Sequence, residues 1–431
     1  MLDLQFIRDN AELIRTVCKN KNVDIDIDHF LKLDTQRGQL IAKVEDLRAK
    51  RNQLAASVKD AKPSEADVKK GKELKSQVEK LEKELGPVEK EHAELWQKIP
   101  NVYSDDTPVG KDESANKVIR QWGDKPKFDF KPKSHWELGK SLGLIDSETA
   151  AVVAGSRFAY LKGNLVLLQF ALWRLALETL TSADKLKAIA QAAKLDVPVT
   201  PFIPVLPPAM IRGDVFAKTG RRDPEEDKYY LKDDDLFLVG SAEHTLAPMH
   251  AEQLLPAQQL PLRYVGHTTN FRREAGSYGK DVRGILRVHQ FDKLELFSIT
   301  TAKQGQVEQN LIVAIQEYLM QQLGLPYQVV AIATGDMGKP DYRQLDIETW
   351  LPSQQTYRET QTADWNTDFQ ARRLGIKYQS EDGQKRYAHT NDATAFSQRP
   401  LIAILENYQT AAGKVKIPEA LQPYMGGAKF L

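Results

Sequence analysis

Cysteine is almost missing from this chain of 431 residues, in which it occurs only at Cys18. A disulfide within the chain and a zinc site built from several cysteines are therefore excluded. The single cysteine favours a reducing, cytoplasmic location. An excess of either charge is also missing, because 60 basic residues stand against 59 acidic ones. Any affinity for nucleic acid must therefore come from a local cluster of Lys and Arg.

Long hydrophobic runs are missing as well. The most apolar stretch, Leu165 to Leu177, is shorter than the about 20 residues that cross a bilayer, and it contains Arg174. We expect this stretch to form a buried helix. The N-terminal residues carry early acidic side chains and lack the basic start of a signal peptide. We therefore expect no membrane attachment.

Glycine-rich phosphate loops are the third missing feature. The sequence contains neither G-x-G-x-x-G nor a Walker loop, which excludes a nucleotide site of the Rossmann or P-loop type. The length is sufficient for two or three domains. We expect an N-terminal helical domain over residues 1–105 and a second domain over residues 106–431, because the two parts differ in pattern.

Two heptad patterns dominate the first domain. Apolar residues recur at alternating spacings of four and three, which places them on one stripe of each of two helices. The seam residues are Leu40, Val44, Leu47, Arg51, Leu54 and Val58 in the first helix, and Leu74, Val78, Leu81, Leu85, Val88, His92, Leu95 and Ile99 in the second.

The two helices are expected to form an antiparallel hairpin. Pro63 ends the first helix and Ser64 is a suitable N-cap for the second. Each helix should be about 45–50 Å long at about 1.5 Å per residue. We expect Gly86-Pro87 to interrupt and kink the second helix.

Basic side chains gather toward the predicted turn of the hairpin. They are Arg48, Lys50, Arg51, Lys59, Lys62, Lys69, Lys70, Lys72 and Lys75. The heptads alone are compatible with a dimerising coiled coil or a spacer, whose charges would only be solvated. A basic arm that binds RNA phosphates is the alternative interpretation.

The second domain mixes strand and helix patterns. Residues 102–132 are rich in Pro, Gly, Asp and Lys and indicate a linker. Apolar alternation predicts strands at 263–272 and 285–299 around a polar loop at 276–284, and another strand at 344–351.

The densest group of reactive side chains follows the first of these strands. The segments Asn270–Gly276 and Arg283–Phe291 contain several arginines. An arginine in a sheet is costly unless it meets an anion, and its planar fork matches phosphate oxygens. Taken alone, this segment is equally compatible with a surface hairpin that carries ordinary ion pairs.

The segment Phe271-Arg272-Arg273-Glu274, with its loop and return strand, resembles motif 2 of the class II aminoacyl-tRNA synthetases. The longer run Arg272–Glu295 resembles the seryl members of that class. Further blocks resemble the same family in the same order: Val205–Pro208 (motif 1), Ser241-Ala242-Glu243 (a serine-binding segment), Thr334–Gly338, Asp368–Arg373 and Arg399–Asn407 (motif 3). The helical hairpin resembles the tRNA arm of the seryl family.

The resemblance implies an α+β fold, with an antiparallel sheet flanked by helices and an N-terminal helical hairpin. It implies that L-serine is activated with ATP to seryl-adenylate and transferred to tRNA(Ser), and also to tRNA(Sec). It further implies a homodimer formed through motif 1. His289 and Cys18 need no covalent role, because in-line attack on the α-phosphorus requires positioning and charge neutralisation.

The same resemblance assigns roles to individual residues. Arg272, Glu295 and Arg399 are expected to be catalytic, with Arg272 at the α-phosphate and Arg399 at the γ-phosphate. The expected serine site consists of Ser241, Ala242, Glu243, Arg272, Glu295 and Thr394. The expected ATP site consists of Arg272, Arg273, Glu274, Val288, Phe291, Glu359, Thr360, Gln361, Thr362 and Arg399. Glu359 and Thr362 are expected to hold Mg²⁺.

Three segments depart from the family pattern. Glu359–Asp364 replaces the usual Glu-Ile-Ser-Ser-Cys-Ser, and Ser241 replaces a threonine. The segment before Arg399 is one residue shorter than usual. Counting back six residues from Arg399 gives Ala393, which cannot bind a hydroxyl, so we choose Thr394 as the second contact of the serine side chain, with Asn391 as the alternative.

Other functions remain open from the sequence. A related ligase that charges a carrier protein would resemble only the catalytic half of the chain. A catalytically silent, RNA-binding relative would be expected to lose the arginines or the serine-binding carboxylates, which are present here.

Overall fold

The computed structural model describes residues 1–57, 64–275 and 283–431. Within them the chain divides into two compact units, Met1–Pro100 and Asn101–Leu431. The predicted turn of the hairpin, with Lys59, Lys62 and Pro63, lies outside the described residues, as does most of the predicted loop at 276–284.

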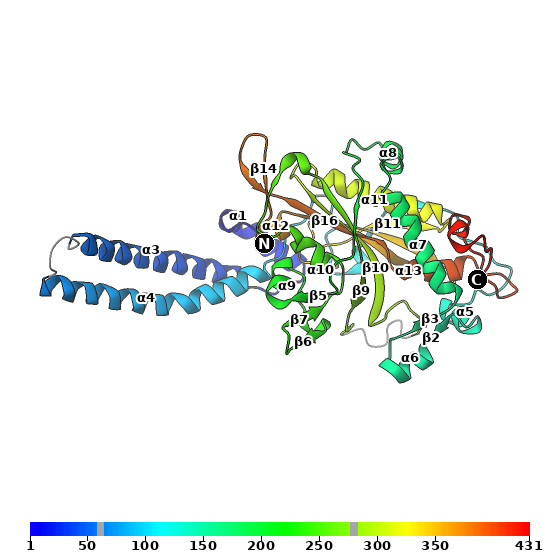
Figure 1. Ribbon diagram of the computed structural model, residues 1–431, viewed down its shortest axis with the longest axis horizontal. Coiled ribbons are helices and arrows are strands. Elements are labelled where there is room, and N and C mark those ends of the chain that lie inside the picture. Colours follow the sequence, from blue (N-terminus) through cyan, green and yellow to red (C-terminus); the bar gives the residue numbers. More distant parts are fainter. Residues whose placement is uncertain (58–63, 276–282) are drawn as a thin grey trace. The chain divides into compact units, whose positions relative to one another are not determined.

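The first unit is helical. Two short helices, α1 (Leu4–Asp9) and α2 (Ala11–Asn20), precede the long helices α3 (Ile27–Ser57) and α4 (Glu65–Lys98), which pack side by side (Figure 1). The Ser64 side chain accepts a hydrogen bond from the Asp67 N–H in a capping box, which confirms the predicted N-cap. The predicted interruption at Gly86-Pro87 is wrong, because α4 continues through Pro87. A proline removes one helix hydrogen bond, and packing against α3 maintains the rest.

Part of the heptad seam is buried within this hairpin. Leu40 and Val44 of α3 and Leu74 and Val78 of α4 are all buried. The two helices therefore satisfy their apolar stripes against each other.

Polar side chains meet near the start of α3 and the end of α4. The buried His92 stacks on Phe30 with ring centroids 4.9 Å apart, and its Nε2 lies 3.2 Å from Asp34 Oδ1. Asp34 also accepts a hydrogen bond from Arg8 Nε at 2.6 Å.

The second unit is built on an antiparallel sheet. Within the described residues its eight strands follow the order β1-β11-β12-β13-β16-β10-β9-β4, and only β4 runs parallel to its neighbour β9. The strands are β1 (Lys117–Trp122), β4 (Ile203–Val205), β9 (Leu262–Phe271), β10 (Gln290–Thr300), β11 (Tyr327–Ala331), β12 (Arg343–Leu351), β13 (Thr356–Thr367) and β16 (His389–Phe396). This architecture confirms the predicted α+β fold.

Helices cover both faces of the sheet because its central strands carry apolar side chains on both sides. On β10, Leu294 and Leu296 face the core beneath α7 (Asn164–Leu180), α11 (Gly305–Gln322) and α13 (Arg399–Asn407). Phe297 and Ile299 belong to a second core beside α10 (Glu243–Leu246) and α12 (Phe369–Leu374). The remaining elements are α5 (His135–Ser141), α6 (Ser147–Ala154), α8 (Ala183–Ala192), α9 (Gly213–Thr219), β2 (Ile145–Asp146), β3 (Tyr160–Leu161), β5 (Met210–Arg212), β6 (Tyr230–Leu231), β7 (Leu236–Leu238), β8 (Leu254–Pro256), β14 (Lys377–Gln379), β15 (Lys385–Tyr387) and the short 3-10 turns.

Two predictions about this unit need correction. The predicted linker at 102–132 contains β1, an edge strand that pairs with β11. The predicted strand at 285–299 begins only at Gln290, because Ile285, Leu286 and Val288 pack into the core instead of joining the ladder. The strand predicted at 344–351 is confirmed as β12.

The apolar run at 165–177 is confirmed as a largely buried helix, α7. Among the described residues, no single helix is long and apolar enough to span a membrane. Helices α7 and α8 meet that test of length and composition only as a pair, and they are bent by 81° at the break between them.

Candidate active site

The two motif 2 strands place Arg272 at the end of β9. Phe271 pairs with Gln290 in the ladder, and the Arg272 N–H donates to His289 O at 3.0 Å. The Arg272 side chain donates from Nε and Nη2 to Gly240 O at 3.2 and 3.1 Å, and its guanidinium carbon lies 5.3 Å from the centre of the Phe291 ring. The guanidinium is thereby held in one orientation by a backbone carbonyl and an aromatic face.

Arg272 lines a narrow cavity on this part of the sheet. The cavity is also lined by Glu274, Leu286, Arg287, Val288, Phe291, Glu359, Thr360, Thr394 and Arg399. An adjoining cavity of about 790 Å³ shares Leu286, Arg287, Glu359 and Arg399 with it. Most of the predicted ATP-binding residues therefore lie around one continuous hollow.

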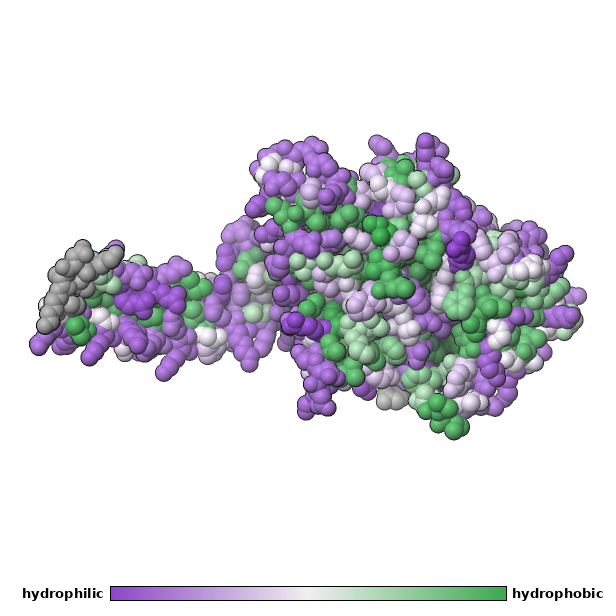
Figure 2. Space-filling view, in the orientation of Figure 1, coloured by the Kyte–Doolittle hydropathy of each residue, from purple (hydrophilic) through white to green (hydrophobic). Residues whose placement is uncertain are grey.

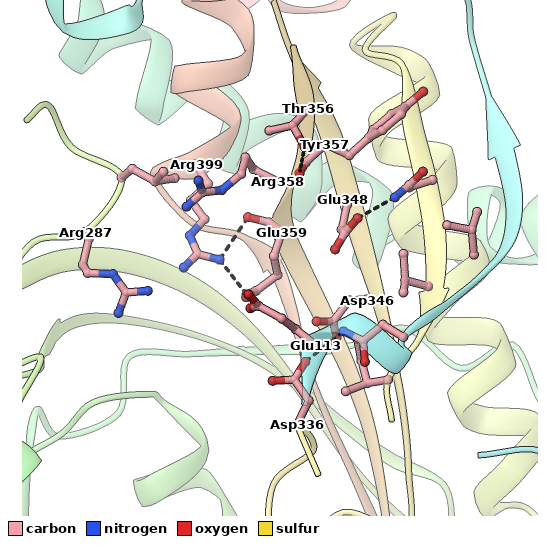
Figure 3. Close-up of a pocket in the computed structure, with 16 residues that line it drawn as sticks. Glu113, Arg287, Asp336, Asp346, Glu348, Thr356, Tyr357, Arg358, Glu359 and Arg399 are labelled. Carbon is pink, nitrogen blue, oxygen red and sulfur yellow. Dashed lines mark hydrogen bonds and ion pairs between the residues drawn. The ribbon is translucent and has the colours of Figure 1, made fainter. Parts of the chain in front are cut away.

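The larger cavity brings cations and carboxylates together (Figure 3). Arg399 Nη1 lies 2.6 Å from Glu359 Oε1 and donates to the Glu359 carbonyl oxygen at 2.9 Å. Arg287 Nη1 lies 2.5 Å from Glu274 Oε2. Both guanidinium groups remain partly exposed, with about 30% of each side chain accessible, so an anion can reach them.

Carboxylates of β12 and β13 form another wall of this cavity. Glu348 is the cross-strand partner of Glu359, and Asp346 also lines the cavity. Burial, and then the charge of Glu359, raise the pKa of Asp346 well above its usual range. Burial also raises the pKa of Glu348. This repulsion between buried acids favours a bound cation.

The other predicted residues of β13 are differently placed. Thr360 Oγ1 lies 2.8 Å from Thr349 Oγ1 and donates to Ile347 O at 3.1 Å. The fully buried Gln361 donates from Nε2 to Ala395 O at 2.6 Å. Their side chains therefore hold the sheet together. Thr362 is the cross-strand partner of Asp346, on the carboxylate side of the strand.

Arg273 is directed away from the other arginines. Its Nε donates to Lys228 O at 2.8 Å, and its guanidinium carbon lies 4.6 Å from the centre of the Tyr229 ring. Arg273, like Gln361 and Thr362, is therefore a predicted ATP-binding residue that does not line either cavity.

The predicted serine-binding residues form a buried polar group beside Arg272. Glu295 Oε2 accepts a hydrogen bond from Ser241 Oγ at 3.0 Å and forms an ion pair with Lys293. Burial raises the pKa of Glu295, although Lys293 opposes the shift. Glu243 Oε1 lies 2.8 Å from Arg221 Nε. Ala242 is buried in the core beneath this group.

The register of β16 bears on the choice between Thr394 and Ala393. Thr394 is the cross-strand partner of Glu295, after an irregularity in the ladder, and it lines the narrow cavity. Ala393 pairs with Leu296 and belongs to the apolar core. The geometry favours Thr394, whose contact with serine stays a prediction.

Several residues of this region were not predicted from the sequence. Asp346 and Glu348 alternate with apolar residues in the predicted strand 344–351, so the pattern contained a signal for them. Arg287 lies within the motif 2 segment. Lys293 lies within the run Arg272–Glu295 and pairs with Glu295 two residues away. Arg221 had no comparable signal, because its role depends on which distant carboxyl groups the fold brings to it.

Comparison with known proteins gives the same family for both units. Residues 1–103 match the seryl-tRNA synthetase N-terminal domain, and residues 226–408 match the tRNA synthetase class II core domain (G, H, P, S and T). A serine–tRNA ligase of Rubrobacter xylanophilus is 40% identical over 99% of this chain and 98% of its own length. One from Pseudothermotoga lettingae is 37% identical over 99% of each chain.

Two similar solved structures belong to the same family as these relatives. The seryl-tRNA synthetase of Pyrococcus horikoshii, solved with ATP, is 36% identical with a TM-score of 0.87, covering 100% of this chain and 99% of its own. The cytoplasmic serine–tRNA ligase of Naegleria fowleri, solved with AMP, is 28% identical with a TM-score of 0.83, covering 100% and 98% of the two chains. The chain therefore belongs to the seryl-tRNA synthetase family, the class II ligases that join serine to tRNA.

Proposed function

We propose that this chain forms seryl-adenylate from L-serine and ATP in the hollow around Arg272 and Arg399. The seryl group then passes to the 3′-terminal adenosine of tRNA(Ser), and also of tRNA(Sec). The observation that carries this assignment is the opposition of arginines and carboxylates across one cavity of about 790 Å³ (Figure 3). Triphosphate requires such cations, and a divalent ion beside it requires such acids.

The arginines bind and orient the phosphates. Arg272 neutralises charge at the α-phosphate, where the serine carboxylate attacks, and Arg399 binds the γ-phosphate end. Attack in line requires that both reactants are held in place, so no protein nucleophile takes part. Phe291 and Val288 enclose the adenine, and Glu274 accepts hydrogen bonds from it. Because Arg273 contacts Tyr229 and Lys228 in the structure, its proposed contact with ATP requires its side chain to move.

The buried acids recognise the amino acid. Glu243 receives the serine ammonium, and Glu295 with Thr394 receives the hydroxyl. Ser241 orients Glu295, because its hydroxyl donates to Glu295 Oε2. A site that pairs the hydroxyl discriminates strongly against alanine, whose binding leaves those polar groups unpaired.

Magnesium fits the acidic wall of the cavity. Glu359 and Thr362 would hold Mg²⁺, with Asp346 and Glu348 as neighbouring oxygen donors. When bound, Mg²⁺ neutralises phosphate charge and orients the triphosphate. Among the described residues, no group of three or more His, Cys, Asp or Glu side chains could hold a metal by itself. The proposed Mg²⁺ would take its other ligands from ATP and water, as Mg²⁺ commonly does.

The helical hairpin is proposed to bind the tRNA. Leu40, Val44, Leu74 and Val78 of its apolar seam are buried where α3 and α4 pack together, so this part of the seam is used within the hairpin and not for a dimerising coiled coil. Lys69, Lys70 and Lys72 are exposed, and within the described chain they form no ion pair. They can therefore contact phosphates, and double-stranded RNA is recognised largely through its shape and backbone.

Exposed apolar side chains near the sheet edge support a proposed homodimer through motif 1. Leu206 is 84% exposed, Ile203 is 51% exposed, and Leu167 and Phe170 of α7 are also exposed. Strand β4 is the last strand of the sheet, and apolar areas are visible on the catalytic unit in Figure 2. Such an edge is normally covered, here by a second copy. We propose a cytoplasmic location, because tRNA and ATP are available there.

Two assays test the proposed function. Serine-dependent ATP–pyrophosphate exchange measures adenylation, and charging of total tRNA measures transfer. A carrier-protein ligase would show the first activity without the second, and a silent relative would show neither. Replacing Leu40–Ile99 by a short linker should keep the exchange and abolish transfer. Equal loss of both activities in a folded deletion variant would contradict the proposed role of the arm.

A further inference from the structure

Arg221 lies in a group of buried carboxyl groups that the reaction itself does not explain. Its Nε is 2.8 Å from Glu243 Oε1, and its Nη2 is 2.8 Å from Asp341 Oδ1 and 3.3 Å from Asp392 Oδ2. Asp364 Oδ2 lies 4.0 Å from the same nitrogen. Within the described residues, one guanidinium thus faces carboxyl groups from four separate segments of the catalytic unit.

The contacts close into a ring of side chains around Glu243. Glu243 Oε1 also accepts a hydrogen bond from Gln370 Nε2 at 2.6 Å. Asn366 Nδ2 donates to Asp392 Oδ1 at 2.6 Å and to Gln370 Oε1 at 3.4 Å. Asp392 in turn accepts a hydrogen bond from Arg221 Nη2, which completes the ring. The Glu243 carboxylate therefore cannot turn without breaking hydrogen bonds to two other members of the ring.

The charges of this group do not cancel. Asp364 and Asp392 are cross-strand partners, and burial raises the pKa of both well above the usual range. Glu243 and Asp341 add two more carboxyl groups around the one guanidinium. A buried negative charge of this kind is costly unless a cation binds.

The direction of the hydrogen bonds shows where such a cation fits. Arg221 and Gln370 both donate to Oε1 of Glu243. Arg221 directs its Nη2 toward Asp341 and Asp392, which neutralise its charge. This arrangement leaves Oε2 of Glu243 for the ammonium group of the amino acid.

We propose that Arg221 is a positioning residue for the amino acid substrate, which acts by fixing Glu243 Oε1 so that Oε2 binds the serine ammonium. The inference rests on the proposed role of Glu243. The opposite interpretation is that the guanidinium occupies the place of the ammonium and competes with it. The two interpretations predict opposite changes in the Michaelis constant for serine.

The test uses the purified full-length enzyme and ATP–pyrophosphate exchange. Arg221→Gln should raise the KM for serine about 10- to 100-fold, the range that is typical when a side chain that orients a metal ligand is lost. The KM for ATP should change little. Arg222→Gln is the matched control, because Arg222 pairs with Glu225, and it should leave the KM for serine unchanged. An unchanged or lower KM in Arg221→Gln would overturn the proposal.

A second variant keeps the test decisive if the first one does not fold. If Arg221→Gln does not fold, Gln370→Met removes the other donor to Glu243 without a change of charge, and it must raise the KM for serine. A Gln370→Met enzyme with the parental KM then overturns the proposal.

Glu243→Gln separates this inference from the proposed function. If Glu243→Gln leaves the KM for serine unchanged, the proposed role of Glu243 fails, and this inference fails with it. If Glu243→Gln raises the KM, adding Arg221→Gln should raise it little further, because Arg221 acts through Glu243. Independent, multiplicative effects would instead show that Arg221 acts elsewhere.

Discussion

Thr394 gives the sharpest test of how the site distinguishes serine from alanine. The residue is 5% exposed, it is the cross-strand partner of Glu295, and it lines the cavity beside Arg272. Replacing Thr394 with Val keeps the shape of the side chain and removes only the hydroxyl. The backbone oxygen of Thr394, which accepts a hydrogen bond from Gln316 Nε2, is not affected by this change.

The expected magnitude follows from one lost neutral hydrogen bond. Such a bond contributes about 0.5–1.5 kcal/mol net, which corresponds to a factor of about 2 to 12. Thr394→Val should raise the KM for serine by this factor and leave the KM for alanine nearly constant, because alanine has no hydroxyl. The ratio of kcat/KM for serine over alanine should fall accordingly. Glu295 and Ser241 remain, so discrimination is reduced and not abolished.

The assay is ATP–pyrophosphate exchange with serine and with alanine, on the parent, Thr394→Val and the control Thr394→Ser. The control keeps a hydroxyl and should discriminate nearly as well as the parent. If Thr394→Val discriminates as well as the parent, Thr394 does not contact the substrate. Asn391 would then be the remaining sequence-based alternative, although it shares a face of β16 with Ala393.

Three further changes test other parts of the molecule. Arg272→Lys should lower kcat/KM for serine-dependent exchange about 10²- to 10³-fold with unchanged circular dichroism, because an ammonium cannot reproduce the fork; a normal rate would show that motif 2 is misassigned. Glu359→Gln should shift the half-maximal Mg²⁺ concentration of exchange upward by about tenfold or more, and an unchanged titration would remove Glu359 from the metal site. In the hairpin, burial lowers the pKa of His92 although Asp34 opposes the shift. The folded His92 then stays neutral at a pH where the unfolded chain, with a histidine pKa of about 6.5, binds a proton. Protection of the hairpin amides against hydrogen exchange, corrected for intrinsic rates, should therefore fall as the pH decreases below about 6.5, and His92→Gln should weaken this dependence; equal slopes in the two proteins would exclude His92 as its source.

The hairpin and the long strands could be predicted because each depends on local periodicity. The stripe from Leu40 to Val44 and from Leu74 to Val78 becomes the buried seam, and the alternation over 344–351 becomes β12. The errors occur where tertiary packing overrides a local signal. Pro87 lies inside a continuous helix held by its partner, and β1 forms in a polar segment because β11 offers an unpaired edge.

Only those residues of the site that lie within a family motif could be predicted from the sequence. Arg272, Arg399 and Glu359 lie within such motifs, and the fold brings all three to one hollow. Arg221 does not lie within such a motif. Its proposed role depends on contacts with residues as distant in the sequence as Asp392. The pattern of one segment cannot predict a contact between two residues that lie so far apart in the sequence.

The site differs from the rest of the core because it contains buried carboxyl groups in place of apolar side chains. Burial, and then the charge of neighbouring acids, raise the pKa of Asp346, Asp392 and Glu295, so each is destabilising when it is ionised without a partner. An apolar core in their place would be more stable, but it would bind neither an ammonium nor a divalent cation. Ligands that supply these positive charges stabilise the folded state in proportion to the logarithm of their concentration over Kd. The cost of these carboxylates in the free protein and their proposed affinity for an ammonium group or a divalent cation therefore have the same physical origin.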